Sequence, residues 1–131
     1  MSKRDEPAFR LDRRKVGILG EETAAAQYRE DGYIILDANF HCRFGELDLV
    51  AFRDGTVVFV EVRTRDENAV ITPAETVDVH KRRKLILTAQ NYLVLNPELS
   101  EFAMRFDVVE VFYKGGYNCR SNRIENAFSV E

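Results

Sequence analysis

Apolar side chains recur at helical spacing in two segments of the chain. The first segment covers residues 16–31, and Gly32 follows it where a C-terminal helix cap would lie. The second segment covers residues 78–95 and is followed by Asn96 and Pro97, a pair that ends helices. The pattern therefore predicts two amphipathic helices, one near the start of the chain and one in its second half.

Other segments have the alternation or the aliphatic and aromatic composition of β-strands. The Asp54-Gly55 pair between two of them is typical of a two-residue hairpin turn. A polar stretch over residues 66–77 contains Pro73 and is predicted to be a long loop. The predicted strands are 33–39, 46–52, 57–65, 105–113 and a short closing strand over 124–130.

The order of these elements, α-β-β-β-α-β with a last strand, predicts the α/β class with a mixed β-sheet flanked by helices. The chain has 131 residues, of which 45% are hydrophobic, and this is enough for one domain with a sizeable buried core. The start of the chain is charged and contains Pro7. We therefore expect residues 1–15 to form a flexible segment and residues 16–131 to form a single domain.

The formal net charge of -3 argues against a protein that coats nucleic acid through overall positive charge. Basic residues are nevertheless clustered locally, above all in the run of residues 81–84. The two cysteines have no CxxC spacing, which argues against a disulfide framework or a cysteine-rich zinc site and favours a reducing compartment. No secretory signal or membrane-spanning run is apparent, so we expect a cytoplasmic protein without a membrane partner.

The predicted hairpin brings two acidic residues together. A tight turn at Asp54-Gly55 sets the register of the two strands, and in that register Asp48 lies opposite Glu61. Side chains alternate along a strand, so polar residues share one face of the hairpin and apolar residues share the other. The polar face is predicted to carry Glu46, Asp48, Glu61 and Arg63, and the apolar face Leu47, Leu49, Val60 and Val62.

Two opposed carboxylates suggest a cation site, because their Cβ atoms lie about 4.5 to 5.5 Å apart and like charges there destabilise a sheet. Mg²⁺ or Mn²⁺ would compensate the charge, polarise a phosphoryl oxygen and activate a water, as phosphodiester hydrolysis requires. Arg63 would stabilise charge on the phosphate, and Glu21, on the small-residue side of the first helix, offers a third oxygen ligand. The alternative is an ordinary solvated surface with salt bridges. Residues 57–60 are apolar on both faces, which favours a covered central strand and an enclosed site.

A series of residues along most of the chain, from about Val16 to Phe128, resembles the uncharacterised bacterial YraN family. The residues that carry the resemblance are Gly20-Glu21 with Ala24 and Tyr28, Gly32-Tyr33, Asn39, Gly45-Glu46-Leu47-Asp48-Leu49, Phe59-Val60-Glu61-Val62-Arg63, Lys81 with Leu85, Ala89 and Tyr92, and Arg105-Phe106-Asp107-Val108-Val109. That family is similar to the restriction-endonuclease-like, or PD-(D/E)xK, superfamily and to archaeal Holliday-junction resolvases. The resemblance implies a restriction-endonuclease-like mixed sheet with flanking helices, a Mg²⁺ or Mn²⁺ site and DNA as the substrate.

Carried over residue by residue, the resemblance implies that Glu21, Asp48 and Glu61 hold the metal ion, with the Val62 carbonyl as a further ligand. The proline that often precedes the first acid in the superfamily is Leu47 here, at a position known to vary. Resolvase-like relatives act as dimers on symmetric junctions, so a homodimer is expected by analogy.

The lysine of the superfamily signature is replaced by Arg63. Arginine stays protonated and can act only as a charge and a hydrogen-bond fork, so catalysis would be weakened or lost. Either Arg65 or Lys81 could take over part of the role. Nucleic-acid contacts are predicted for Lys81, Arg65 and Lys84, although a basic run is also typical of a helix face that only meets water.

These observations lead to a first hypothesis, a metal-dependent endonuclease that acts on structured or branched DNA. In this hypothesis Asp48, Glu61 and Arg63 are the catalytic residues. The alternative is a non-catalytic nucleic-acid-binding or protein-interaction module that keeps the nuclease fold. A purely structural adaptor is the least favoured function, because it gives no reason for three acids to converge.

Overall fold

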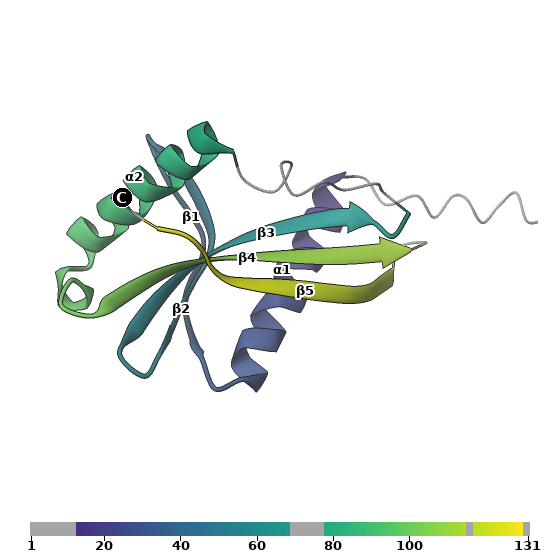
Figure 1. Ribbon diagram of the computed structural model, residues 1–131, viewed down its shortest axis with the longest axis horizontal. Helices are drawn as coiled ribbons and strands as arrows, with labels where there is room; N and C mark the ends of the chain where they lie inside the picture. The colour runs from purple at the N-terminus through teal and green to yellow at the C-terminus, as the bar shows by residue number, and fades with distance from the viewer. Residues whose placement is uncertain (1–12, 69–77, 115–116, 130–131) are drawn as a thin grey trace, which may run out of the picture.

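The computed structural model describes residues 13–68, 78–114 and 117–129. The elements in chain order are α1 (Arg13–Glu30), β1 (Ile34–Cys42), β2 (Gly45–Arg53), β3 (Thr56–Asp66), α2 (Val79–Leu95), the short 3₁₀ helix η3 (Pro97–Leu99), β4 (Ala103–Lys114) and β5 (Tyr117–Phe128). The five strands form one sheet in the order β1-β2-β3-β4-β5, and α1 and α2 pack against its opposite faces (Figure 1). β3 and β4 are parallel, and the other neighbouring strands are antiparallel.

This architecture confirms the predicted α/β class and the predicted order of elements. α1 begins at Arg13, earlier than predicted, and β5 begins at Tyr117 rather than at residue 124. The first half of β5 is polar and lacks an apolar alternation, but it pairs with β4 through the backbone, which needs no such pattern. The predictions for residues 1–12 and 69–77, and for Val130 at the end of the predicted closing strand, lie outside the described residues.

β3 is the central covered strand that the sequence predicted. Val57, Val58, Phe59 and Val60 are at most 2% exposed. Alternation sends Val57 and Phe59 into the core layer under α2, and Val58 and Val60 into the layer under α1. Full burial of one such side chain stabilises the fold by about 1.5 to 3 kcal/mol, so this strand anchors both layers.

The hairpin between β2 and β3 has the predicted turn. Asp54 and Gly55 both have positive φ angles, 49° and 75°, as a type I′ turn requires. The pairs next to the turn follow the predicted register, and they are Arg53↔Thr56, Phe52↔Val57, Ala51↔Val58, Val50↔Phe59 and Leu49↔Val60.

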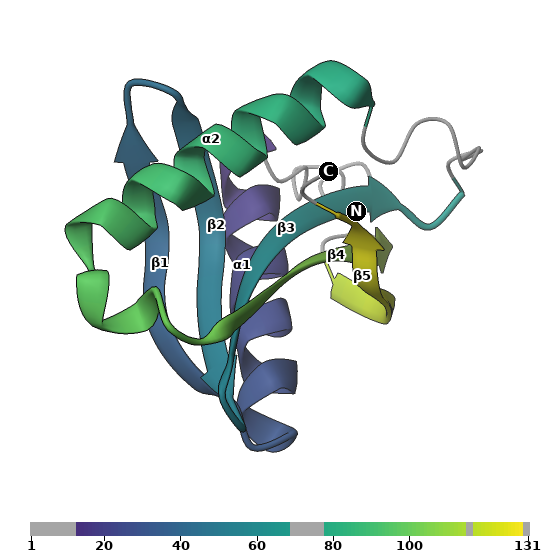
Figure 2. The same ribbon diagram turned by 60° about the vertical axis from the view of Figure 1, so that its left-hand side comes forward.

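Beyond these pairs, β2 and β3 separate. β2 stays paired with β1 as far as Gly45, whereas β3 stays paired with β4 as far as Asp66. Figure 2 shows β3 curving away from β2. Asp48 and Glu61 are the first residues past the separation, and they do not form the ladder pair that the sequence predicted.

The predicted division of the hairpin into a polar and an apolar face is wrong for β2. Leu49 packs with Val60 in the layer under α1, whereas Leu47 packs with Phe40 in the layer under α2. Strict alternation would put Leu47 and Leu49 on the same face. The alternation of side chains between the two faces of the sheet is therefore interrupted in β2, and the interruption lies at Asp48.

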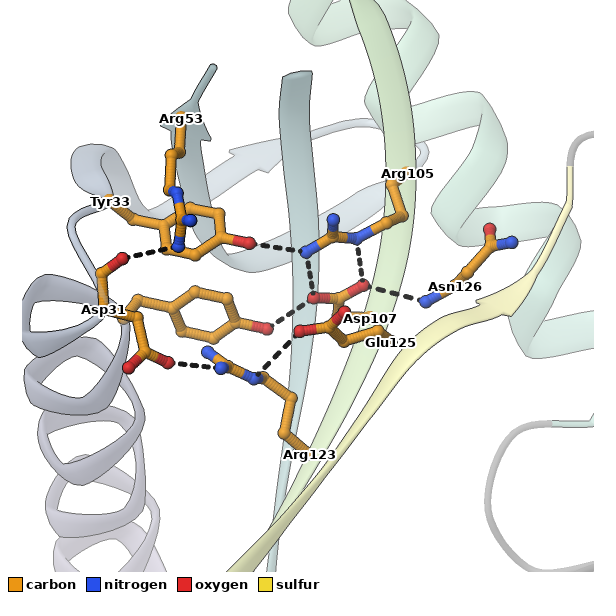
Figure 3. A network of polar contacts seen from close by, with 9 residues as sticks. Asp31, Tyr33, Arg53, Arg105, Asp107, Arg123, Glu125 and Asn126 are labelled. Carbon is orange, nitrogen blue, oxygen red and sulfur yellow. Dashed lines mark hydrogen bonds and ion pairs between the residues drawn. The ribbon is translucent and has the colours of Figure 1, made fainter. Parts of the chain in front are cut away.

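A buried carboxylate on β4, that of Asp107, ties α1 to the sheet (Figure 3). It accepts hydrogen bonds from the Tyr28 hydroxyl at 2.7 Å, from Nε and Nη2 of Arg105 at 2.8 and 3.0 Å, and from the Asn126 backbone N–H at 3.0 Å. Burial and the neighbouring carboxylate raise the pKa of Tyr28 well above its ordinary value. This network fixes how α1, and the acidic side chain that α1 contributes to the site, lies on the sheet.

Candidate functional site

Four elements bring charged side chains to the place where β2 and β3 separate. Glu21 comes from α1, Asp48 from β2, Glu61 from β3 and Lys81 from the first turn of α2. Asp48 interacts electrostatically with Glu61, Glu21 and also Glu46. The side chains predicted as metal ligands thus lie near one another, although they come from three separate elements.

Asp48 fills the gap that opens between the two strands. Its Oδ2 accepts a hydrogen bond of 2.7 Å from the backbone N–H of Val62, so the side chain takes the place of a ladder partner. Burial raises the pKa of Asp48 to about 8, and the charge of Glu61 is the second cause. The hydrogen bond from Val62 lowers the pKa of Asp48, whereas Glu21 and Glu46 raise it further. The site therefore disfavours a negative charge on Asp48 as long as no further positive charge is present.

Glu61 is the buried acid of the group, with 8% of the residue exposed. Nζ of Lys81 lies 3.2 Å from its Oε2, and Nε of Arg63 lies 3.6 Å from the same oxygen. Two cations thus contact one carboxylate oxygen, which offsets the cost of burying its charge.

Glu21 reaches the site because α1 lies very close to β3. A Cβ atom on the preceding residue, Gly20, would be 2.0 Å from Cγ2 of Thr64 on β3, so only glycine permits this approach. Burial raises the pKa of Glu21, and the charges of Glu46 and Glu61 act in the same direction. A hydrogen bond from the Asn39 side chain opposes these effects on the pKa of Glu21.

The start of α2 presents Lys81 to the site. Asp78 is the N-cap, and its side chain accepts a hydrogen bond of 2.8 Å from the backbone N–H of Lys81. This bond is the main reason that the pKa of Asp78 lies below its ordinary value. The cap fixes the first turn of the helix. It therefore also fixes the backbone position from which the Lys81 side chain extends to Glu61.

The other two residues predicted to contact nucleic acid are Arg65 and Lys84, and they have different neighbours. Nε of Arg65 lies 3.9 Å from Oε2 of Glu110 on β4, so its guanidinium faces the neighbouring strand. Lys84 is exposed on α2 and lies beside the start of β2. A Cβ atom added to Gly45 would be 4.0 Å from the Cβ atom of Lys84. Of the two residues considered as substitutes for the signature lysine, Lys81 reaches the acidic cluster and Arg65 contacts Glu110.

The donor atoms suit a hard divalent cation, because carboxylate and carbonyl oxygens are the ligands that Mg²⁺ and Mn²⁺ prefer. The raised pKa of Asp48 also fits a site that takes up positive charge. In the described part of the chain, however, no three or more His, Cys, Asp or Glu side chains are arranged to hold a metal ion. The carboxylate of Glu61 is instead held in ion pairs with Lys81 and Arg63. Metal binding would require Glu61 to turn from those partners.

Two residues of the site carried only the family resemblance in the sequence, which gave them no part in the acidic cluster. Asn39 lies on β1 and hydrogen-bonds to Glu21, and Gly20 lets α1 approach β3. The residue type gave a weak signal in each case: an asparagine within an apolar strand, and a glycine within a helix. Neither signal indicates which distant residue is contacted.

Comparison with known proteins confirms the family that the resemblance indicated, because UPF0102 is the YraN family. The model of the uncharacterised protein family UPF0102 matches residues 20–111, a range that contains Glu21, Asp48, Glu61 and Lys81.

Within the described residues, neither long helix has the length and the apolar character that crossing a membrane requires.

Relatives similar in length to this chain are also named as UPF0102 proteins. A UPF0102 protein of Caldanaerobacter subterraneus subsp. tengcongensis is 39% identical over 103 residues, which cover 79% of this chain and 84% of the relative. A UPF0102 protein of Clostridium botulinum is 37% identical over 116 residues, 88% of this chain and 94% of the relative. One from Alkaliphilus oremlandii is 39% identical over 117 residues, 88% of this chain and 98% of the relative.

Proposed function

The chain belongs to the uncharacterised protein family UPF0102, and we propose that it is a metal-dependent endonuclease that hydrolyses phosphodiester bonds in structured or branched DNA. The names of the relatives state no activity, so the proposal depends on the site. The observation that carries it is the approach of Glu21, Asp48 and Glu61 from three elements at the separation of β2 and β3. A fold gains no stability from such repulsion, so a function that uses the charges is the better explanation.

Glu21, Asp48 and Glu61 would hold Mg²⁺ or Mn²⁺, with the Val62 carbonyl as a further ligand. Such an ion polarises a phosphoryl oxygen and lowers the pKa of a bound water. Asp48 would be the best-oriented ligand, because the Val62 N–H holds one of its oxygens at 2.7 Å and leaves the other free of that bond. The neighbouring cations would stabilise the charge that develops on the phosphate.

Lys81 is the residue that we assign to the role of the missing lysine. Arg63 stays protonated and can act only as a charge and a hydrogen-bond fork, so a second cation beside the acids would complete the site. Nζ of Lys81 already lies 3.2 Å from Glu61, and its side chain is 45% exposed, so it is within reach of both the acids and a bound substrate. If Glu61 held a metal ion, the Lys81 amine would be available to donate a hydrogen bond to a phosphate oxygen.

The start of α2 supports a nucleic-acid substrate. The first turn of this helix contains no acidic residue, and the basic run Lys81–Lys84 lies at its positive end. Cations near a helix N-terminus are unfavourable by about 0.3 to 1 kcal/mol each, and the N-cap carboxylate of Asp78 offsets part of this effect for the run. Phosphate groups are the anions that such a helix start accommodates best. Lys81 and Lys84 would contact the DNA backbone, and Arg65 would join them only after leaving Glu110.

A non-catalytic nucleic-acid-binding or interaction module is the second candidate. It is favoured by the ion pairs of Glu61 with Lys81 and Arg63, which compensate the buried charge without a metal ion. In this case DNA binding would survive a chelator, and Asp48→Asn would leave it unchanged. A homodimer, as on a symmetric junction, is compatible with either candidate.

The test is an incubation of the full chain with branched and single-stranded DNA in the presence of Mn²⁺. The matched variants are Asp48→Asn in the site and Asp54→Asn in the turn, where asparagine suits the positive φ angle equally well. We expect cleavage by the wild type and by Asp54→Asn, and none by Asp48→Asn. Cleavage no greater than that of Asp48→Asn would reject the nuclease, and binding in chelator would then decide for the second candidate.

A further inference from the structure

Asn39 has a backbone conformation that is unusual for the middle of a strand. Its φ angle is 57°, although it lies within β1. Strand residues normally have φ angles near -120° to -140°, and asparagine is one of the few residues that tolerates the left-handed region. Asp54 has a similar φ angle because it forms a tight turn, but Asn39 is not in a turn.

The left-handed residue lies where β1 and β2 change faces. Ala38 pairs with Leu49 and Phe40 pairs with Leu47, so Asn39 lies opposite Asp48. Leu49 belongs to the core layer under α1, whereas Phe40 and Leu47 belong to the layer under α2. The alternation of exposure along β1 also breaks here, since Ala38 and Asn39 are both exposed.

This reversal determines where the Asp48 side chain can go. In a regular strand it would project from one face of the sheet. Here it lies at the reversal and extends sideways to β3, where Oδ2 accepts the Val62 N–H at 2.7 Å. The unusual backbone of Asn39 and the orientation of Asp48 are thus two parts of one local geometry.

The side chain of Asn39 makes a second link, to a different element. It hydrogen-bonds to the carboxylate of Glu21 on α1. An amide N–H is a suitable donor to a carboxylate and, unlike a lysine or an arginine, adds no charge that would compete with a cation. One residue therefore contacts the helix acid and lies beside the strand acid.

We infer that Asn39 is the positioning residue of the acidic site: its left-handed backbone turns Asp48 toward β3, and its amide holds Glu21 beside it. The backbone conformation and the contact with Glu21 do not depend on the proposed function, whereas the consequence for metal binding rests on it. Asn39 itself is not a ligand in this inference, because its amide is engaged with Glu21.

Three substitutions separate the backbone role from the side-chain role. Asn39→Gly keeps the left-handed conformation and removes the amide, whereas Asn39→Ala removes the amide and also disfavours the conformation. Asn39→Asp tolerates the conformation but faces Glu21 with a second carboxylate. Asn126→Gly is the matched control, because Asn126 also has a positive φ angle, 53°, and lies on β5 beside Asp107.

The first measurement needs no metal ion. The urea midpoints of Asn39→Gly, Glu21→Ala and the double variant are compared in the presence of a chelator. If Asn39 holds Glu21, the double variant should shift the midpoint by less than the sum of the single shifts. The same cycle with Asn126→Gly should be additive. Additive shifts for Asn39→Gly would overturn the inference, whatever the function of the site.

The second measurement is a calorimetric titration of the full chain with Mn²⁺ alone. Loss of a residue that orients a ligand typically weakens metal binding about 10- to 100-fold, so we expect this loss for Asn39→Gly and a larger one for Asn39→Ala. Asn126→Gly should bind like the wild type. Wild-type affinity in Asn39→Gly would overturn the inference. A wild type that binds no Mn²⁺ would reject the proposed function instead, and the unfolding cycle would then decide the role of Asn39.

Discussion

At Asp48, two opposing effects act on one carboxyl group. The backbone N–H of Val62 stabilises the charged form, while burial and Glu61 disfavour it. The second effect is larger, because the pKa of Asp48 rises from an ordinary value of 3.8 to about 8. Without an additional cation, the site therefore favours the protonated form of Asp48. A divalent ion would reverse this state, so metal binding should release a proton.

The raised pKa of Asp48 predicts how stability depends on pH. Between the unfolded value of 3.8 and the folded value of about 8, the folded state binds more protons than the unfolded state. The free energy of unfolding should therefore fall as the pH rises through this window, by at most about 1.4 kcal/mol per pH unit from this group. Asp48→Asn keeps an acceptor for the Val62 N–H and removes the titration. Its urea midpoint should depend less on pH and should exceed that of the wild type above pH 8.

The control for this pH series is Asp54→Asn, which removes an exposed carboxylate from the turn. It should reproduce the slope of the wild type across the whole window. The same slope in Asp48→Asn and in the wild type would contradict the assignment, since some other group would then carry the pH dependence.

At the scale of elements, the packing of α1 against β3 decides whether Glu21 reaches the site. A Cβ atom on Gly20 would lie 2.0 Å from Cγ2 of Thr64 but 3.5 Å from its Cβ. Gly20→Ala should therefore push α1 from the sheet and destabilise the fold by about 1 to 3 kcal/mol, as overpacking does. Thr64→Ser removes the clashing methyl group, so the double variant should regain most of the lost stability in thermal unfolding.

Gly17 provides the internal comparison, because a Cβ there would meet nothing within 4 Å. Gly17→Ala should stabilise the helix by roughly 0.5 to 1 kcal/mol, because alanine has less conformational entropy than glycine in the unfolded chain and loses less of it on folding. If Thr64→Ser failed to rescue Gly20→Ala, the close approach of α1 to β3 would not be the reason for the glycine.

The elements were predictable from the sequence because each depends on a local pattern. Helical spacing identified α1 and α2, and the Asp54-Gly55 turn set the register as far as Leu49 and Val60. The separation of β2 from β3 was not predictable, because it results from competition with β1 and β4 for backbone pairs. The change of face at Asp48 depends on the conformation of Asn39 on another strand, which no period in the sequence encodes.

The candidate site shows the same limit. Asp48 and Glu61 were placed near each other by counting from a turn, and they do interact, although not as a ladder pair. Lys81 is distant from both in sequence, and only the packing of α2 on the sheet brings it to Glu61. Contacts between elements far apart in the chain are the part of a site that periodicity cannot supply.

At the scale of the whole molecule, a net charge of -3 coexists with a proposed DNA substrate. Long-range attraction is then weak, and binding must depend on a few phosphate contacts at the start of α2. Each such contact releases counterions, so the slope of log K against log salt changes by about 0.9 for each contact to a duplex arm. Binding measured in chelator separates this effect from any catalysis.

Lys84→Gln should reduce that slope by about 0.9, the change expected for one lost phosphate contact. It should also weaken binding to branched DNA to a similar degree for different sequences, because a phosphate contact does not read bases. Lys114→Gln removes the same charge from another exposed lysine, at the end of β4, and should leave the slope unchanged. Fluorescence anisotropy at several salt concentrations gives both slopes. Equal losses in the two variants would mean that only overall charge matters, and unchanged slopes in both would exclude Lys84 as a phosphate contact.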